Sequence, residues 1–269
     1  MVRTLRDDGV AVVYNNFART VTAESHQNAA KELSNIEDMI ARHVDVIILQ
    51  TVSTQALKKD IAKAEEAGIP VFLTSVGADP SGILGAVVVD LKAVGRLDAE
   101  WIRHDAAGRG TEVGVIAGAP GAASDLLVEG FTGALPANVR VVDNQPAMFD
   151  PARARQVAAA MIQAHPGLDY AFVANEEMAF AVRKAFDEAG AKGVKIVTVN
   201  GTDEGLAALK DGRFAATVAN SAADTGQLAV ENVISLLRQQ KAEKIDKTPI
   251  RLVTKEDADT APLYCPRHE

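Results

Sequence analysis

The feature of this sequence that most constrains its fold is a regular alternation between short apolar segments rich in β-branched residues and longer segments with helical periodicity. Such alternation is typical of βαβ units, in which parallel strands are buried between helices on both faces of a sheet. The sequence therefore predicts an α/β fold with parallel sheets. The predicted strands are 10–14, 45–50, 71–74, 85–89, 112–117, 139–144, 169–174, 195–200 and 215–219.

The helices between these strands have recognisable ends. Asp150 is followed by Pro151, which predicts a helix with an aspartate N-cap and a proline at its first position. The helix predicted over 54–67 ends at Gly68, and Pro70 opens the next strand. Apolar residues recur on one face of each helix, and we expect that face to be in the core.

The pattern of strands and helices runs through the chain twice, before and after about Asp90. A chain of 269 residues is long enough for two lobes that each bury a core. Because the chain returns to its first half after Asn220, we predict two doubly wound lobes rather than one closed barrel. The amino lobe is predicted to comprise 1–89 and 221–251, and the carboxyl lobe 90–220 and 252–269.

Composition and charge disfavour several functional classes. The formal net charge is -8 and the basic residues are scattered along the chain, which argues against a nucleic-acid-binding surface. No apolar run approaches the ~20 residues that cross a bilayer. Cys265 is the only cysteine and the histidines are spread out, so we expect no disulfide, metal site or cofactor. Residues 1–10 contain no secretion signal, which indicates a mature or trimmed form, or a cytosolic protein.

No catalytic constellation is recognisable. The glycine-rich segment 118–122 is neither a phosphate-binding loop nor a dinucleotide fingerprint, and it is typical of a turn between a strand and a helix. The motif of a serine-nucleophile elbow is also missing. Glu176 and Glu177 lie at a predicted helix start, where negative charge complements the helix dipole. We therefore expect no enzymatic activity.

Polar side chains follow the predicted strands, at the edge where a parallel sheet binds its ligands. Most of them are amides and hydroxyls, which both donate and accept hydrogen bonds and suit a neutral polyhydroxylated ligand. Each has a second interpretation as a turn residue or helix cap. Three asparagines at the same topological place are harder to explain by capping alone. The residues concerned are Gln50, Thr51, Ser75, Asp90, Asn175, Asn200, Thr202, Asn220 and Ser221.

Several stretches form a recognisable set, for example Ala-Asn-Glu-Glu-Met-Ala at 174–179 and Asn-Gly-Thr at 200–202. The others are 27–31, 36–40, 44–48, 67–71, 129–131, 209–213, 216–219 and 252–255. In order and spacing the set resembles the periplasmic sugar-binding proteins of the ribose-binding type, the substrate-binding components of ABC transporters. The resemblance implies two Rossmann-like lobes of periplasmic-binding-protein type I, joined by three strands near Val89, Asn220 and Leu252. It further implies a monomer in the periplasm that closes on a sugar-like ligand and delivers it to a membrane permease.

The resemblance also implies roles for single residues. Phe149 would cover one face of a sugar ring. Asn175, Asn200 and the hinge residue Asn220 would form hydrogen bonds with it. Gln50 would contribute the polar position of the amino lobe.

The sequence departs from the family's pattern in three places. Ser75 and Val76 replace an Asp-Arg pair, and Asp125 and Leu127 replace arginines. Without an arginine fork, we expect a neutral sugar, polyol or other small metabolite rather than ribose itself. Ser75 is expected to line the cleft, and Asp125 would there accept from hydroxyls or pair with a cation. The family's opening strand and most of its first helix have no counterpart, so the amino lobe is predicted to be shortened.

The main alternative is the effector-binding region of a LacI-type transcription regulator, which shares the two-lobe fold. Such a protein carries a helix-turn-helix and a hinge helix before its first lobe, and neither is present in this sequence. The stretch 252–255 favours the transport proteins. An enzyme built on a Rossmann-like lobe is a weaker alternative, because no clustered base or nucleophile accompanies the strands.

Overall fold

The computed structural model describes residues 29–49, 58–74, 82–240, 243–261 and 264. The chain separates into two compact units. The described residues of Met1–Val89 join Ala222–Pro249 in the first unit, and Asp90–Ser221 join those of Ile250–Glu269 in the second. The chain therefore passes between the units three times. The predicted strand 10–14 and the predicted site residues Gln50 and Ser75 lie outside the described residues.

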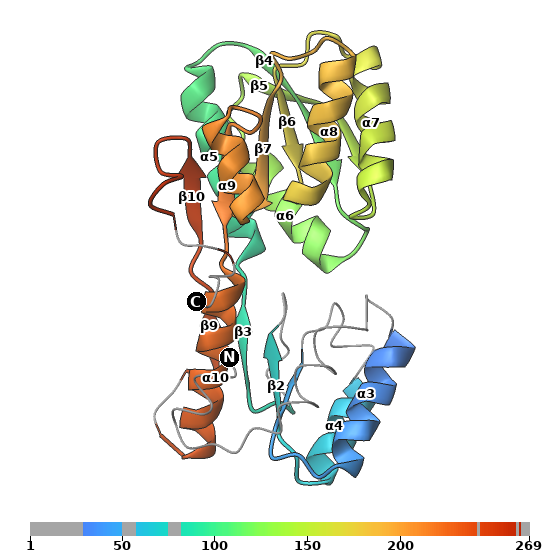
Figure 1. The fold of residues 1–269 in the computed structure, drawn as a ribbon, viewed down its shortest axis with the longest axis vertical. Helices are drawn as coiled ribbons and strands as arrows, with labels where there is room; N and C mark the ends of the chain where they lie inside the picture. The colour runs from blue at the N-terminus through green and yellow to red at the C-terminus, as the bar shows by residue number, and fades with distance from the viewer. Residues whose placement is uncertain (1–28, 50–57, 75–81, 241–242, 262–263, 265–269) are drawn as a thin grey trace. The chain divides into compact units, whose positions relative to one another are not determined.

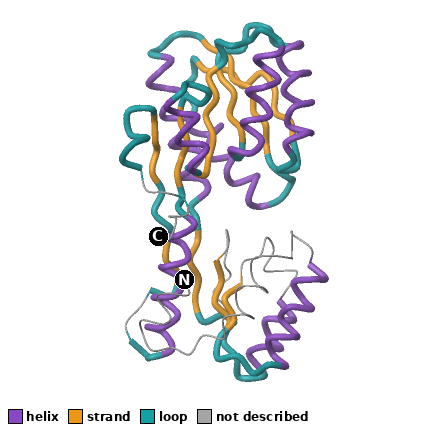
Figure 2. The backbone as a smooth tube through the Cα atoms, viewed as in Figure 1, coloured by secondary structure: helices purple, strands orange, loops and turns teal. Residues whose placement is uncertain are grey.

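The first unit is a parallel sheet with helices on both sides (Figures 1 and 2). Its described strands run in the order β1-β2-β3-β9, and each neighbouring pair is parallel. The strands are β1 (Ile47–Leu49), β2 (Val71–Thr74), β3 (Gly85–Val88) and β9 (Ile245–Lys247), and the helices are α3 (Ala29–Ala41), α4 (Lys58–Glu66) and α10 (Ala222–Leu237).

Two apolar clusters form the core of the first unit. Leu73 of β2 packs in one cluster with Ile61 of α4. Phe72, its neighbour in the same strand, packs in the other cluster with Val233 of α10. Successive side chains of a strand point to opposite faces of the sheet, so both faces are covered. This explains why the strands are apolar without interruption instead of alternating with polar residues.

The second unit contains a six-stranded sheet in the order β10-β8-β7-β6-β4-β5. The strands from β8 to β5 are mutually parallel, whereas β10 runs antiparallel to β8. The predicted α/β fold is confirmed, with the correction that β10 makes this sheet mixed at one edge. The strands are β4 (Thr111–Ala117), β5 (Val139–Pro146), β6 (Tyr170–Val173), β7 (Lys195–Asn200), β8 (Ala216–Ala219) and β10 (Arg251–Thr254). The helices are α5 (Leu91–Ala106), α6 (Ala122–Ala134), α7 (Pro151–Ala164), α8 (Glu176–Glu188) and α9 (Asp203–Lys210).

Helices α5 and α6 approach each other closely because each presents a glycine to the other. A Cβ atom at Gly95 of α5 would overlap the backbone of α6, and one at Gly130 of α6 would overlap the backbone of α5. Beneath them, the rings of Phe131 and Phe172 stack with centroids 4.2 Å apart, and both are fully buried. As the sequence predicts, Asp150 caps α7 by accepting from the backbone N–H of Arg153, with Pro151 at the helix start.

The amino ends of β6 and β7 are tied to the end of α5 through Asp105. The Tyr170 hydroxyl donates to the Asp105 carboxylate at 2.6 Å, and the Lys195 ammonium lies 2.6 Å from the same group. Trp101 of α5 contacts Tyr170 edge-on. Burial raises the pKa of Asp105, but the hydrogen bonds from Lys195 and Tyr170 outweigh it and hold that pKa below its ordinary value.

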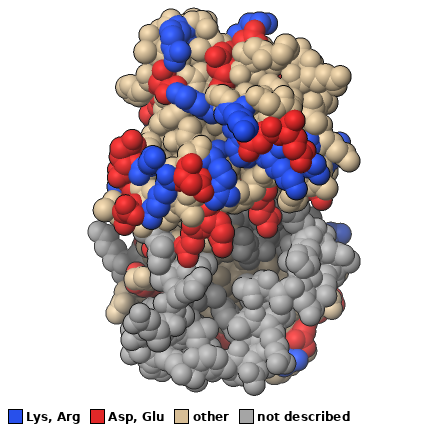
Figure 3. Space-filling model, turned by 45° about the horizontal axis from the view of Figure 1, so that its top comes forward, with Lys and Arg blue, Asp and Glu red and all other residues tan. Residues whose placement is uncertain are grey.

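The described surface is polar and mixed in charge. None of the described helices is both long and apolar enough to cross a bilayer. On the face shown in Figure 3, the described lysines and arginines are interspersed with aspartates and glutamates. Exposed ion pairs such as Arg155–Glu188 and Lys92–Glu129 belong to this mixed surface.

Candidate ligand-binding site

The carboxyl ends of the parallel strands form one edge of the sheet in the second unit, which we call the carboxyl edge. Residues that end neighbouring parallel strands lie side by side along such an edge. Asn175 follows β6, Asn200 ends β7 and Asn220 follows β8, and these three strands are adjacent. Phe149 follows β5, farther along the same edge. The structure thus brings four of the predicted site residues to a common edge.

The predicted site residues are spread over several strands of this edge. Neighbouring strands lie about 4.8 Å apart, so Asn175, Asn200 and Asn220 span roughly 10 Å. The Phe149 ring lies over Gly118, which follows β4, so it is about three strands, or roughly 14 Å, from Asn220.

Asn175 caps a helix and also has groups available for a ligand, the two roles that the sequence allows. Its side-chain oxygen accepts from the backbone N–H of Met178 at 2.9 Å and so caps α8. The nitrogen of the same amide has no hydrogen-bond partner among the described residues. A backbone N–H needs an acceptor, so the orientation of the amide is fixed. Asn175 can therefore offer a ligand two N–H donors, while its oxygen already accepts one hydrogen bond from the helix.

Asn200 has an unusual backbone conformation. Its φ is 131°, and Gly201 after it has a φ of 75°. Positive φ is uncommon for residues other than glycine and carries strain. The backbone N–H of Asn220 donates to the Asn200 carbonyl at 3.1 Å, which continues the ladder between β7 and β8 to their ends. The two asparagines are thus held next to each other by the sheet itself.

Glu176 is a residue of this edge whose contacts the sequence does not predict. It lies in the first turn of α8, as expected, but it is only 2% exposed and turned toward the β7–α9 turn. Its carboxylate accepts from the backbone N–H of Gly201 at 2.9 Å and of Thr202 at 2.8 Å. The hydroxyls of Thr202 and Thr217 donate to it as well. Burial raises the pKa of Glu176, against the lowering effect of these hydrogen bonds.

Phe149 is positioned by a strained turn. Met148 and Phe149 have φ values of 60° and 55°, two consecutive left-handed residues that are not glycine. The turn places the Phe149 ring so close to Gly118 that a Cβ atom there would overlap three ring carbons. Gly118 therefore makes room for an aromatic ring at the carboxyl edge.

Asp125 lies in the first turn of α6, where its side chain is exposed. None of the other predicted site residues contacts it in the described part of the second unit. Its role, like those of Gln50 and Ser75 outside the described residues, stays a prediction. No three His, Cys, Asp or Glu side chains of the described residues form a group that could hold a metal ion.

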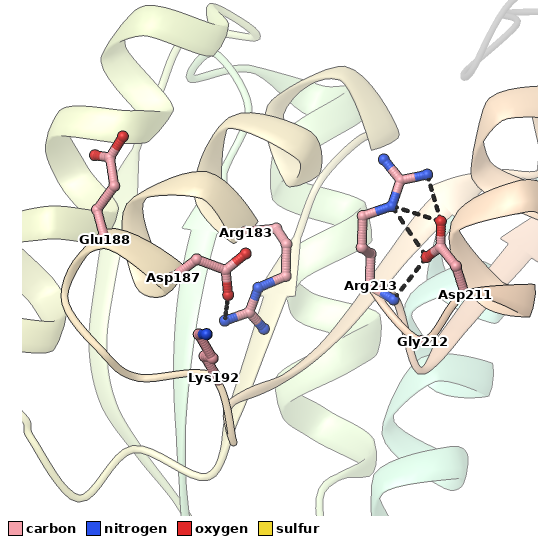
Figure 4. Close-up of a pocket in the computed structure, with 7 residues that line it drawn as sticks. All are labelled: Arg183, Asp187, Glu188, Lys192, Asp211, Gly212 and Arg213. Carbon is pink, nitrogen blue, oxygen red and sulfur yellow. Dashed lines mark hydrogen bonds and ion pairs between the residues drawn. The ribbon is translucent and has the colours of Figure 1, made fainter.

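A surface hollow of about 490 Å³ lies at the opposite end of the second unit (Figure 4). Its charged groups largely satisfy one another, because Arg183 pairs with Asp187 and Arg213 pairs with Asp211. Arg183 also donates to the backbone carbonyl of Val194 at 2.8 Å. These contacts join the ends of α8 and α9 to the amino ends of the following strands. The hollow is a structural feature, remote from the carboxyl edge.

The sheet topology and the polar carboxyl edge define a ligand-binding protein of the type I periplasmic class. The family model described as periplasmic binding protein domain matches residues 3–241, and the chain belongs to this family. The predicted resemblance to the ribose-binding type is confirmed by the relatives below.

Two relatives and one solved structure illustrate the similarity. The ribose import binding protein of Haemophilus influenzae is 30% identical over 251 residues, which cover 93% of this chain and 85% of the relative. The ribose import binding protein of Bacillus subtilis is 28% identical over 237 residues, covering 88% and 77%. A solved structure is the binding component of the arabinose ABC transporter from Shewanella sp. ANA-3, bound to α- and β-L-arabinofuranose. It matches with a TM-score of 0.84 at 25% identity, covering 96% of this chain and 86% of that one.

Proposed function

We propose that this chain is the substrate-binding component of an ABC importer, which captures a small neutral sugar or polyol-like ligand in the periplasm and presents it to a membrane permease. The observation that carries the proposal is the row of Asn175, Asn200 and Asn220 along the carboxyl edge, with the Phe149 ring at the other end. Relatives that import ribose, and a solved relative bound to L-arabinofuranose, support it.

The chemistry of the edge favours an uncharged ligand. The three asparagines supply amides, and Phe149 supplies an apolar face for the C–H groups of a sugar ring. Glu176 is the buried charge at this edge, and its carboxylate is already occupied by four donors from Gly201, Thr202 and Thr217. A ligand carboxylate or phosphate would find no basic partner among these residues. Hydroxyl groups can use the unpartnered N–H donors of Asn175.

The proposed action is binding without catalysis. The two units are inferred to be two lobes that close on the ligand, with the hinge where the chain passes between them after Val89, Ser221 and Pro249. A ligand that contacts both lobes only in the closed form shifts the equilibrium toward that form. The closed form is what a permease would recognise. We expect the protein to act as a monomer and to bind no nucleic acid.

The test is calorimetric titration of the full-length chain with D-ribose, D-allose, L-arabinose, xylitol and myo-inositol. Asn175→Asp keeps the oxygen that caps α8 but replaces both N–H donors by an acceptor, so a loss of affinity cannot be attributed to a lost cap. One hydrogen bond is worth about 1 to 3 kcal/mol when its partner stays buried, which predicts roughly 5- to 150-fold weaker binding.

Gln163→Glu is the matched control, because it makes the same change from amide to carboxylate at an exposed position of α7. It should bind every sugar as the unmodified chain does. Unchanged affinity in Asn175→Asp would remove Asn175 from the site. If the unmodified chain binds none of the five compounds, the proposed ligand class is wrong.

A further inference from the structure

The carboxylate of Glu176 connects three segments that the sequence keeps far apart. Glu176 begins α8, directly after Asn175. Its hydrogen bonds reach Gly201 and Thr202, directly after Asn200, and Thr217 in β8. One buried group therefore adjoins two of the residues proposed to bind the ligand.

The backbone around Asn200 is shaped to bind this carboxylate. Two successive N–H groups that converge on one anion form a nest, a conformation that requires at least one left-handed residue. Asn200 and Gly201 supply positive φ values, and the N–H groups of Gly201 and Thr202 converge on the two oxygens of Glu176. Gly205 leaves the necessary room, because a Cβ atom there would overlap the carboxylate.

No lysine or arginine of the described residues forms an ion pair with Glu176. The titratable groups next in the chain to Glu176 and to its donors are acidic: Glu177 on α8, and Asp203 and Glu204 in the first turn of α9. Asp98 on α5 is near enough for the charge of Glu176 to act on its pKa. The basic residues of α8, α9 and α5 that the structure describes form no ion pair with Glu176. Asp98 is completely buried, and neither of its carboxyl oxygens has a hydrogen-bond partner. Burial and then the charge of Glu176 raise the pKa of Asp98. Glu176 accepts four hydrogen bonds and Asp98 none, so Glu176 is the member of the pair that can hold a negative charge.

We infer that Glu176 is a positioning residue, whose ionised carboxylate holds Asn200 in its strained conformation and thereby fixes the Asn200 side chain relative to Asn175. The inference rests on the proposed function only in assigning those two asparagines to the ligand. The neutral acid of Asp98 beside Glu176 leaves the backbone and hydroxyl donors as the groups that stabilise the negative charge. The amino-terminal dipoles of α8 and α9 add to them.

The test is an NMR titration of the full-length chain, following the amide protons of Gly201 and Thr202. Amide protons that donate to a carboxylate resonate at low field, so both should move to higher field as Glu176 takes up a proton. We expect one common midpoint above 4.5, the ordinary value for glutamate, since burial raises this pKa. Two different midpoints, or no movement of either amide between pH 4 and pH 8, would overturn the inference. This measurement needs no variant and no sugar.

Two variants separate the role of Glu176 from that of its neighbour. Glu176→Gln keeps the shape but offers one acceptor oxygen instead of two, so the titration of both amides should disappear. Asp98→Asn is the matched control: it removes the other buried carboxyl, leaves the hydrogen bonds of Glu176 in place and should retain the same midpoint. Retention of the titration in Glu176→Gln would assign it to another group and refute the inference.

Affinity for the five compounds above provides the functional measurement. For whichever compound the unmodified chain binds, we expect Glu176→Gln to bind at least tenfold more weakly, and Asp98→Asn to bind within twofold at pH 7. As the pH is lowered through the midpoint of the amide titration, the affinity of the unmodified chain should decrease. Equal affinity in Glu176→Gln would refute the positioning role. If no compound binds, the proposed function fails, while the amide titration still decides whether Glu176 holds the turn.

Discussion

Asp98 should make the stability of the second unit depend on pH, and Asp98→Asn should remove that dependence. Asp98 is 0% exposed, in a stripe of α5 that packs in the core together with Val94 and Ile102. Its pKa lies well above the ordinary 3.8, because burial and the charge of Glu176 disfavour ionisation. Its carboxyl oxygens form no hydrogen bond in the structure, so replacing one by an amide nitrogen breaks none.

The sign and the magnitude of this pH dependence of the free energy of unfolding follow from proton linkage. Above about pH 4 the unfolded chain has released the Asp98 proton, whereas the folded chain keeps it until the raised pKa is reached. The folded state thus binds more protons, and the free energy of unfolding decreases as pH rises, by about 1.4 kcal/mol per pH unit for one such group. The asparagine variant cannot ionise and lacks this loss. Relative to the unmodified chain, Asp98→Asn should therefore gain up to about 1.4 kcal/mol of unfolding free energy for each pH unit between the ordinary pKa of 3.8 and the raised pKa of Asp98.

The assay is urea unfolding followed by tryptophan fluorescence. Trp101 is the only tryptophan of the chain and lies on α5, so its signal reports the second unit without interference from the first. Glu176 also has a raised pKa, but it is present in both proteins and largely cancels in their difference. A stability difference that stays constant as the pH rises above about 4 would show that Asp98 is not held in its neutral form.

Two further predictions concern the two ends of the second unit. Gly118→Ala should displace the Phe149 ring and weaken sugar binding at least tenfold with little loss of stability, measured by calorimetry and urea unfolding; unchanged affinity would show that the ring does not contact the ligand. Tyr170→Phe removes the hydroxyl that donates to Asp105 at the opposite edge and should lower the free energy of unfolding by about 1 to 2 kcal/mol without altering affinity. An unfolding midpoint equal to that of the unmodified chain would contradict the second expectation.

The sequence predicts the strands that follow the alternation of strands and helices, including the largely exposed β5, and misses β9 and β10. Both ends of β2 and β7 are predicted, because uninterrupted apolar runs are bounded by polar or turn residues. β9 has three residues with mostly exposed side chains, and its pairing with β3 depends on where the chain returns from the second unit. β10 is likewise defined by its partner, β8, and no local pattern could have revealed its antiparallel direction.

Some residues of the candidate site can likewise be predicted from the sequence, and others cannot. The three asparagines can be placed from the sequence, because strand alternation determines which residues reach the carboxyl edge. Phe149, three residues beyond the end of β5, is assigned only through the family resemblance. The contacts of Glu176 cannot be predicted, since they depend on Gly205 and Thr217, which only the folded sheet brings near it. Asp98 did leave a signal: it falls on the apolar stripe of α5 between Val94 and Ile102, a core position where an aspartate is out of place.

The distribution of backbone strain supports the carboxyl edge independently of any side-chain chemistry. Of the described residues other than glycine, those with positive φ are His43, Ala107, Met148, Phe149, Asn200 and Gln239. His43, Ala107 and Gln239 lie just beyond the ends of α3, α5 and α10, where left-handed residues commonly terminate helices. The other three lie at the carboxyl edge, where no helix end requires them.

Strain of this kind costs of order 1 to 3 kcal/mol per residue and persists only where the surrounding structure enforces it. Here the enforcing contacts are visible: Glu176 binds the turn after Asn200, and Gly118 makes room for the ring of Phe149. A fold that only needed stability would relieve these costs. Their concentration at one edge is expected if that edge is shaped to hold a ligand.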